Sequence, residues 1–155
     1  MKENETLKRA IGQQFLDLYT VFEALDKQVR KFGTDVDIFH SEIRMLSHIA
    51  KNAGIHVGGL AELLRITKGS VSEIVKKLEK KGLVEKRVSD DNLSKLSLWL
   101  TEKGRVAYTD HMRYHAMLDE ALGAGLVSAS EENLWFLLGF LKSANETTVK
   151  LFTEV

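Results

Sequence analysis

His111 and His115 are the residues of this sequence whose spacing most directly suggests chemistry. Residues four positions apart lie on one face of a helix, so the two imidazole rings would project side by side. Neutral imidazole binds zinc, and two such rings could chelate one metal ion. The alternative is that both rings form hydrogen bonds within a crevice or line a pocket for an organic ligand. Two histidines without further ligands favour this alternative over a metal site.

A cationic helix face is the second chemical feature. The segment from Thr67 to Gly82 begins with a good helix-capping residue and ends with a residue type that commonly follows helices. One stripe is apolar at helical spacing: Val71, Ile74, Val75 and Leu78. The opposite face holds small, hydroxyl and charged residues: Gly69, Ser72, Glu73, Lys76, Lys77 and Lys80. Such a face suits a DNA groove, although a solvated amphipathic helix has the same pattern.

Positive charge is concentrated around this helix. Between Arg65 and Arg87 there are eight Lys or Arg residues against three Glu residues, whereas the whole chain of 155 residues has a formal net charge of zero. From Val88 to the end, ten acidic residues outnumber six basic ones. A uniformly basic coating is therefore excluded, and any contact with phosphates should be local to residues 65–87.

Enzymatic chemistry has little support in the sequence. There is no cysteine, which excludes disulfides, thiolate zinc sites and cysteine-based oxidant sensing. There is no glycine-rich phosphate loop, and adjacent carboxylates stand where a hairpin tip or helix ends are expected: Asp90-Asp91, Asp119-Glu120 and Glu131-Glu132. We therefore expect no enzyme, and any signal should be a small molecule, a metal held by histidines and carboxylates, or a partner.

The elements next to the cationic helix predict a winged helix. A short helix over residues 57–64 is separated from Thr67 only by Arg65-Ile66, which is typical of a helix-turn-helix. After Gly82, residues 83–88 and 96–100 read as two strands joined by a polar tip at 89–92, because apolar residues alternate with others over 96–100. A helix-turn-helix followed by such a hairpin is a winged helix.

Four further helices should complete the chain. The first is predicted over residues 6–32 from one apolar seam: Leu7, Ile11, Phe15, Leu18, Phe22, Leu25, Val29 and Phe32. The second covers 38–51 and turns Ile43, Leu46, Ile49 and Ala50 inward as part of the winged-helix core. The others are predicted over about 101–122 and 130–152. In the helix over 101–122, the stripe of Tyr108, His111, His115, Leu118 and Leu122 should face inward.

The last helix is apolar on more than one face. Trp135, Phe136 and Phe140 lie outside its seam of leucines, which is unusual for a helix at an exposed surface. Burial against a second copy of the chain is the simplest solution. The alternative is that Trp135 and Phe140 pack onto the first helix of the same chain.

Four motifs of the sequence resemble the MarR family of bacterial transcriptional regulators. They occur in the family's order and at its spacing over almost the whole chain: Leu60-Ala-Glu-Leu-Leu, Ile66-Thr-Lys-Gly-Ser-Val-Ser, Lys77-Leu-Glu-Lys-Lys-Gly-Leu-Val and Leu100-Thr-Glu-Lys-Gly104. The resemblance implies a mainly α fold, with a small β-hairpin wing and long terminal dimerisation helices. Residues 1–155 would form one unit, in which 36–100 is the DNA-binding lobe and 1–35 plus 101–155 the dimerisation region.

The resemblance also implies a DNA-binding surface. The expected contacts are Thr67, Lys68, Gly69, Ser70, Ser72, Glu73, Lys76, Lys77, Lys86, Arg87 and Lys95. One departure from the family affects the wing, whose Asp-x-Arg usually inserts its arginine into the minor groove. Here the tip reads Asp91-Asn-Leu-Ser-Lys95, so wing contacts must come from Lys95, Lys86 or Arg87, or be weaker.

In this family an effector binds where the dimerisation helices meet the winged helix. The matching residues are Phe15, Tyr19, Phe22, Met45, Tyr108, His111 and His115. Zinc-responsive members carry two histidines at the positions of His111 and His115, with further ligands from the first two helices. Glu23 and Glu42 roughly match those further ligands, although Glu42 stands where such members have a histidine. A small organic effector and zinc are thus both open, and no cofactor is required.

These observations predict a cytoplasmic homodimer that binds a pseudo-palindromic operator in duplex DNA. Repression is the commonest role in the family, and a small ligand would modulate DNA affinity. One alternative is a zinc-responsive regulator of the same fold. The other is a winged-helix protein-interaction module that does not read DNA, which the neutral total charge and the missing wing arginine favour. The polar start of the chain is no signal peptide, and no apolar run is long enough for a membrane span.

Overall fold

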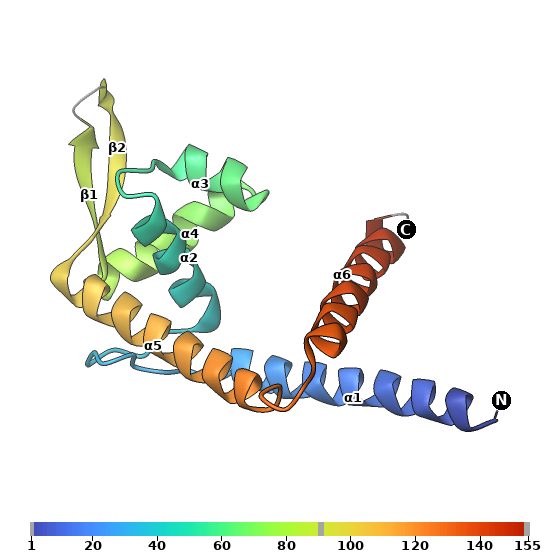
Figure 1. Ribbon diagram of the computed structural model, residues 1–155. Helices are drawn as coiled ribbons and strands as arrows, with labels where there is room; N and C mark the ends of the chain where they lie inside the picture. Colours follow the sequence, from blue (N-terminus) through green and yellow to red (C-terminus); the bar gives the residue numbers. More distant parts are fainter. Residues whose placement is uncertain (1, 90–91, 154–155) are drawn as a thin grey trace. The chain divides into compact units, whose positions relative to one another are not determined.

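The computed structural model describes residues 2–89 and 92–153, and it is mainly helical with one two-stranded hairpin (Figure 1). The side chains of residues 2, 3, 26, 89, 92–95, 152 and 153 lie outside the described part. The elements are α1 (Lys2–Asp26), α2 (His40–Lys51), α3 (Val57–Leu64), α4 (Lys68–Lys80), β1 (Val84–Ser89), β2 (Asn92–Leu100), α5 (Glu102–Ala124) and α6 (Glu131–Thr153). The predicted fold class is confirmed.

The chain divides into two compact units, Met1–Met112 and Arg113–Val155, and the boundary falls within α5. The first unit contains the winged helix, in which the hairpin stands beside α2, α3 and α4 and α5 begins at its base (Figure 1). Among the described residues, the fully buried side chains all lie between Ile38 and Ala107: Ile38, Leu46, Ile49, Leu60, Val71, Leu78, Leu83, Leu98 and Ala107. Burial of this many large apolar groups is the main stabilising contribution to the lobe.

The first helix ends six residues earlier than its apolar seam predicts. α1 stops at Asp26, and Phe32 and Gly33 have φ of 44° and 69°, which no α-helix contains. Arg30 and Ile38 exchange backbone N–H···O hydrogen bonds of 3.2 and 2.8 Å, so residues 30–38 form a looped segment. Phe32 packs against the lobe core instead of continuing the helix.

The second helix begins two residues later than predicted. Phe39 is its N-cap residue, and the backbone N–H of Phe39 donates to a carboxylate oxygen of Glu42 at 2.8 Å. The predicted inward residues Ile43, Leu46 and Ile49 are buried, whereas Ala50 is only half-buried. Met45 and the charged Glu42 are also buried, which the apolar pattern did not indicate.

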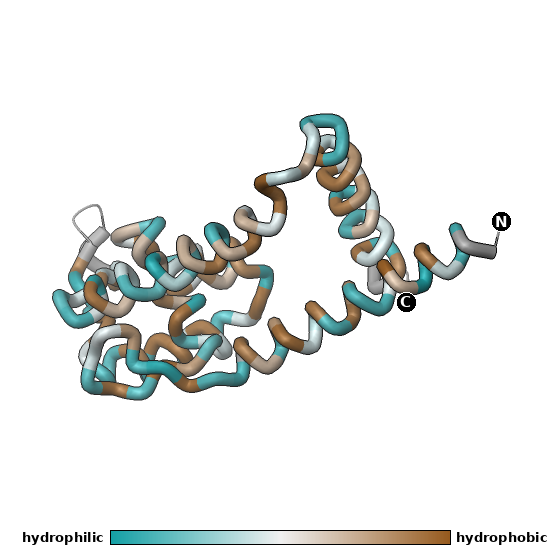
Figure 2. Tube along the Cα trace, turned by 60° about the horizontal axis from the view of Figure 1, so that its bottom comes forward, coloured by the Kyte–Doolittle hydropathy of each residue, from teal (hydrophilic) through white to brown (hydrophobic). Residues whose placement is uncertain are grey.

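Helices α1 and α6 leave most of their apolar side chains exposed. Along α1, apolar and polar residues alternate, as the brown and teal turns of Figure 2 show. Tyr19 on α1 is 65% exposed, and Trp135 and Phe136 on α6 are 65% and 75% exposed. No described side chain of α6 is buried. The seams identified in the sequence therefore exist as helix faces with exposed apolar side chains.

On α5, the predicted inward stripe is covered only in part. Tyr108, His111 and Leu118 are half-buried, whereas His115 and Leu122 are exposed. No described helix combines the length and the low charge that crossing a membrane requires.

Candidate nucleic-acid interface

The tight connection between α3 and α4 sets the direction of the candidate reading helix. Arg65 follows α3 in the left-handed conformation with φ of 54°, and the Ile66 N–H donates to the carbonyl of Ala61 at 3.1 Å. Thr67 then caps α4, because its hydroxyl accepts from the Ser70 N–H at 3.1 Å. The chain therefore reverses within three residues, and the predicted helix-turn-helix is confirmed.

The first helix of this motif is capped by a histidine. His56 Nδ1 accepts a hydrogen bond of 2.7 Å from the backbone N–H of Gly59. Gly58 and Gly59 pass close to that ring, since a Cβ on either residue would lie 3.2 to 3.4 Å from the nearest imidazole atom. This cap was not predicted, because histidine is an uncommon N-cap residue.

The reading helix has one buried and one exposed face, as predicted. Val71, Val75 and Leu78 are buried and Ile74 is half-buried. On the opposite face, Ser72 is half-buried and the other members are exposed: Gly69, Glu73, Lys76, Lys77 and Lys80. Lys68, at the start of the helix, is also exposed. A face of this shape and charge can approach a polyanion without disturbing the core.

Two of the predicted base-contacting hydroxyls already have a local role. The Thr67 and Ser70 oxygens are 2.9 Å apart, within one hydrogen bond, while Thr67 also caps the helix. Any contact of these hydroxyls with DNA would therefore compete with the cap. Ser72 lies further along the helix, has no part in this cap and is half-buried.

Several cations near the helix are paired with carboxylates. Lys77 Nζ lies 2.9 Å from Glu73, which raises the pKa of Lys77 and lowers the pKa of Glu73. Both side chains are exposed, so this pair is weak and can yield to a phosphate. Among the side chains that the structure describes, Lys68 and Lys76 form no ion pair.

The base of the wing holds two further cations. Lys86 Nζ lies 2.7 Å from a carboxylate oxygen of Glu79 on α4. Arg87 pairs with Glu85, and its guanidinium carbon lies 5.1 Å from the ring centroid of Trp99. The Trp99 Nε1–H donates to the Ser97 hydroxyl at 2.9 Å, which fixes the indole under the arginine. Both wing cations thus have carboxylate partners within the chain.

The hairpin is anchored at its base to neighbouring segments. The strands pair from Val84↔Leu100 to Ser89↔Asn92, with an irregularity after Val88. The Thr101 hydroxyl donates to the Gly82 carbonyl at 2.6 Å and accepts from the Gly104 N–H at 3.0 Å. A Cβ at Gly104 would lie 2.0 Å from the Leu83 carbonyl oxygen, so only glycine fits there. This explains the Thr-Glu-Lys-Gly motif physically.

The wing tip lies mostly outside the described part of the structure. Asp90 and Asp91 are outside the described residues, as is the side chain of Lys95, so the predicted wing contact of Lys95 stays a prediction.

Two of the predicted effector residues line different pockets. Phe15 lines a groove along α1, and Met45 lines a separate pocket between α2, α3 and α4. Tyr19 is exposed and Phe22 is half-buried on α1. His111 stacks edge-on against Phe32 with ring centroids 5.4 Å apart, and His115 packs edge-on against Tyr114 at 6.2 Å. Their assembly into one effector site stays a prediction.

Two of the predicted metal ligands pair with lysines. Within the described residues, no three His, Asp or Glu side chains gather in a way that could hold a metal ion. Glu23 pairs with Lys27 at 2.8 Å. Glu42 is buried, and both its oxygens accept from Lys81 Nζ, at 2.7 and 2.5 Å. The structure thus assigns Glu42 to an ion pair, whose desolvated carboxylate keeps its counter-ion beside it.

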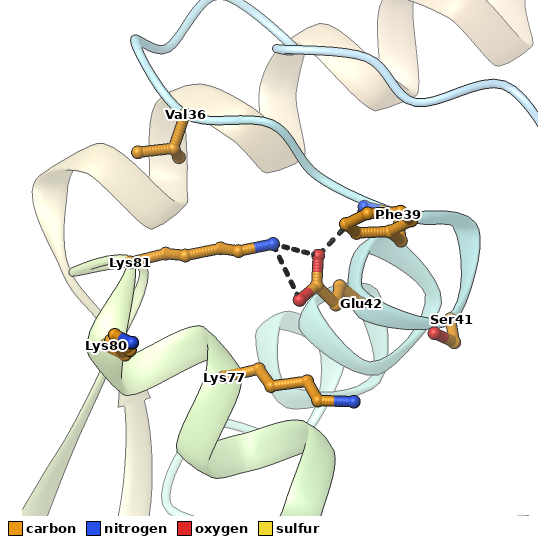
Figure 3. A pocket seen from close by; sticks show the side chains of 7 residues that line it. All are labelled: Val36, Phe39, Ser41, Glu42, Lys77, Lys80 and Lys81. Carbon is orange, nitrogen blue, oxygen red and sulfur yellow. Dashed lines mark hydrogen bonds and ion pairs between the residues drawn. The ribbon is translucent and has the colours of Figure 1, made fainter.

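The Glu42–Lys81 pair is a feature that sequence reasoning missed (Figure 3). Lys81 Nζ also donates to the Asp37 carbonyl at 2.7 Å and lies 4.9 Å from the centroid of the Phe39 ring. It therefore ties the end of α4 to the loop before α2 and to the first turn of α2. The two charges are 39 positions apart in the chain, and no local pattern connects them.

Comparison with known proteins agrees with this geometry. Residues 37–92, which span α2 to the start of β2, match the MarR family. The HTH-type transcriptional regulator YybA of Bacillus subtilis (strain 168), itself uncharacterized, is 29% identical over 118 residues, covering 76% of this chain and 79% of YybA. The chain is therefore similar to the MarR family over residues 37–92, and the relatives that it matches are named as transcriptional regulators.

Solved structures share the fold over most of the chain. Streptococcus pneumoniae FabT, crystallised in complex with DNA, has a TM-score of 0.66 and 22% identity, covering 95% of this chain and 98% of FabT. Lactococcus lactis ZitR, a zinc-responsive MarR family member, has a TM-score of 0.72 and 19% identity, covering 90% of this chain and 98% of ZitR. At these identities the likeness establishes the fold alone.

Proposed function

We propose that this protein is a MarR-family regulator, a cytoplasmic homodimer that binds a pseudo-palindromic operator in duplex DNA through α4. The observation that carries the proposal is the exposed face of α4, where Ser72, Lys76 and Lys77 lie opposite a buried apolar stripe. Ser72 and Gly69 would approach base edges, and Lys68, Lys76 and Lys77 would contact phosphates. Lys86 and Arg87 would add phosphate contacts from the base of the wing.

The proposed dimer rests on the two terminal helices. Exposed apolar residues line α1 and α6, and water contact at so many large side chains is unfavourable. Residues 36–100 would form the DNA-binding lobe, and 1–35 with 101–155 the dimerisation region. In a two-fold dimer the reading helices would enter half-sites about one helical turn, roughly 10 base pairs, apart.

The experiment for DNA binding is a fluorescence anisotropy titration with duplex DNA at several salt concentrations. We expect a steep loss of affinity with salt, and we expect Lys76→Ala to reduce the slope of log K against log[salt] by about one, since one phosphate contact is lost. Lys8→Ala, which removes an exposed lysine of α1, is the matched control. An unchanged slope in Lys76→Ala would show that Lys76 does not contact a phosphate.

The role in transcription is proposed as repression relieved by a small ligand. A ligand that binds better to dimers with one spacing of the two lobes would change the fraction of dimers that can span both half-sites. A differential affinity of about 1 to 3 kcal/mol between the two states corresponds to a roughly 5- to 150-fold change in DNA affinity. A reporter gene under the selected operator would show the sign of regulation.

Zinc remains a second candidate signal because the fold matches a zinc-responsive protein and α5 carries His111 and His115 one turn apart. The remaining ligands would be Glu23 and a rearranged Glu42. Elemental analysis of the purified protein, with DNA binding measured in zinc and in chelator, tests this. If the protein holds well under one zinc atom per chain, and neither zinc nor chelator changes its DNA affinity, zinc is not the signal. An organic effector would then be the remaining candidate.

The competing function is a winged helix that binds protein instead of DNA. The carboxylates paired with Lys77, Lys86 and Arg87 favour it, because each reduces the free positive charge. Binding to random duplex DNA at low salt separates the two functions. Only a DNA-binding protein would be retained with a steep dependence on salt.

A further inference from the structure

One face of the wing carries a group of side chains around the indole of Trp99. Residues that pair across an antiparallel hairpin share a face, and the register pairs Glu85 with Trp99 and Arg87 with Ser97. Leu98, on the opposite face of the hairpin, is fully buried in the core of the lobe. The four residues therefore form one group on the side of the wing that faces away from the core.

The indole of Trp99 is held by hydrogen bonds and by close packing. Its Nε1–H donates to the Ser97 hydroxyl at 2.9 Å, and that hydroxyl donates to the Arg87 carbonyl at 3.1 Å. The ring also lies close to the backbone of Gly54, because a Cβ on that residue would be 3.1 Å from Trp99 Cζ2. The Gly54 N–H donates to the Leu98 carbonyl at 3.0 Å, so the segment that leads into α3 pairs with β2. The indole is therefore fixed relative to both the wing and the helix-turn-helix.

The guanidinium of Arg87 contacts an aromatic ring and a carboxylate at the same time. Its carbon lies over the Trp99 ring, 5.1 Å from the centroid, which is within the range of a cation–π interaction. Its Nε–H donates to a carboxylate oxygen of Glu85 at 2.9 Å, and its Nη2 pairs with the same oxygen. A guanidinium that stacks through its face keeps the N–H donors of its edge for an anion. Glu85 thus occupies an edge that a phosphate could use, because carboxylates and phosphates accept from the same fork of donors.

The pair of Arg87 and Glu85 is open to exchange. The two side chains are 55% and 44% exposed, and ion pairs as exposed as this are weak. Arg87 is also the only arginine between Arg65 and Arg105, so no other residue of the hairpin offers a guanidinium fork. A phosphate can therefore replace the carboxylate while the contact with Trp99 persists.

We propose that Trp99 is a positioning residue for DNA binding, which holds the Arg87 guanidinium where a phosphate of duplex DNA exchanges with Glu85. This inference rests on the proposed DNA binding. An arginine that is already oriented loses less side-chain freedom when the complex forms, so the indole increases affinity without touching DNA. The wing then contacts the DNA backbone through β1 and does not need an arginine at its tip.

The test is a fluorescence anisotropy titration of the full chain with duplex DNA at several salt concentrations, after circular dichroism has verified that each variant is folded. Arg87→Ala should lower the slope of log K against log[salt] by about 0.9 for each subunit that contacts DNA. Arg105→Ala, which removes another exposed arginine paired with a nearby glutamate, is the matched control and should keep the wild-type slope. Trp99→Leu should weaken DNA binding about two- to fivefold, and Trp99→Phe should weaken it less because an aromatic ring remains.

The double variant Arg87→Ala/Trp99→Leu separates positioning from a purely structural role. If Trp99 acts through Arg87, loss of the indole should cost no further affinity in the Arg87→Ala background. An equal loss in both backgrounds would overturn the proposal. In the protein without DNA, NMR should show the Arg87 side-chain protons shifted upfield by the indole ring current, and Trp99→Leu should abolish that shift. Protons without such a shift would contradict the stack.

Glu85→Gln tests the exchange step. Removal of the competing carboxylate should strengthen DNA binding, and this gain should shrink in the Arg87→Ala background. Unchanged or weaker binding by Glu85→Gln would overturn the exchange.

The wild type and Lys76→Ala show which proposal has failed. A wild type without salt-dependent DNA binding would defeat the proposed function and this inference together. If the wild type binds DNA and Lys76→Ala lowers the salt slope while Arg87→Ala does not, the proposed function stands and only the inference about the wing is wrong.

Discussion

The winged-helix lobe buries its apolar residues, whereas the terminal helices leave theirs exposed. In the lobe, Ile38, Leu46 and Leu78 have no exposed surface, whereas Tyr19 of α1 and Trp135 of α6 are each 65% exposed. Both regions carry apolar stripes at helical spacing. The difference shows that apolar residues at helical spacing define a helix face but do not say what packs against it.

The largest expected effect is in the lobe. Leu46→Ala should lower the free energy of unfolding by about 2 to 5 kcal/mol, because Leu46 has no exposed surface and its removal leaves a cavity. Urea unfolding followed by circular dichroism measures this. Leu63→Ala, on the exposed side of α3, should change stability by less than about 0.5 kcal/mol. Similar losses for both would contradict the core assignment.

On α6 the expected effect is on assembly. Leu141→Glu places a charge in the leucine seam and should weaken the proposed dimer by about 3 kcal/mol, roughly 100-fold. Ser143→Glu adds the same charge about 200° around the helix and is the matched control. Sedimentation equilibrium measures the dimer. A wild-type monomer of 17.5 kDa at micromolar concentration would remove the contrast between the two regions.

The Glu42–Lys81 pair tests how the lobe tolerates a buried charge. Lys81→Met should cost about 2 to 4 kcal/mol of unfolding free energy, because it leaves the buried Glu42 carboxylate without its counter-ion. Glu42→Gln should restore part of that loss in the double variant, even though the Phe39 cap weakens. An additive double variant would show that the two charges do not depend on each other.

Gly69→Ala separates folding from DNA contact. Gly69 is exposed on α4, and an added Cβ would meet only the Thr67 hydroxyl at 3.8 Å, so alanine should stabilise the helix by about 0.5 to 1 kcal/mol. If the backbone of Gly69 approaches DNA, the same change should weaken operator binding several-fold. Gly12→Ala in α1 is the control for helix stabilisation. Wild-type affinity for the operator in Gly69→Ala would show that the backbone of Gly69 does not approach DNA closely.

The smallest expected effect is a dependence on pH within the lobe. Burial, assisted by Arg44 and Lys51, lowers the pKa of His48 below its usual value of 6.5. As pH falls through that usual value, the unfolded chain takes up a proton that folded His48 resists, so the lobe loses stability under acidic conditions. His48→Gln should reduce the slope of stability against pH between about 6.5 and 5. An identical slope in the variant would contradict this.

Most of the lobe could be predicted from residues that act locally, such as those that cap helices. Thr67 and Gly82 mark both ends of α4, and the structure confirms a cap at Thr67 and a φ of 69° at Gly82. Phe32 misled the prediction of α1, because it has the spacing of the seam but belongs to a loop that packs on the core. Spacing alone cannot distinguish these two fates of an apolar residue.

The candidate site was predictable only where it depends on one helix. The exposed face of α4 follows from its sequence, since helix geometry alone determines which residues share a face. The pairing of Glu42 with Lys81 depends on how α2 and α4 pack, and the pairing of Lys86 with Glu79 depends on how the hairpin folds back. Both are long-range contacts, so their effect on the charge of the surface could not be read from charge counts.

The fastening of the hairpin at Gly82, Thr101 and Gly104 has a consequence for evolution. The Thr101 hydrogen bonds and the buried residues Val84 and Leu98 hold the base of the hairpin, so these contacts lie outside its tip. Doubling the length of a flexible loop costs only about 0.6 kcal/mol. The tip of the wing can therefore change in length and charge while the scaffold below it stays the same.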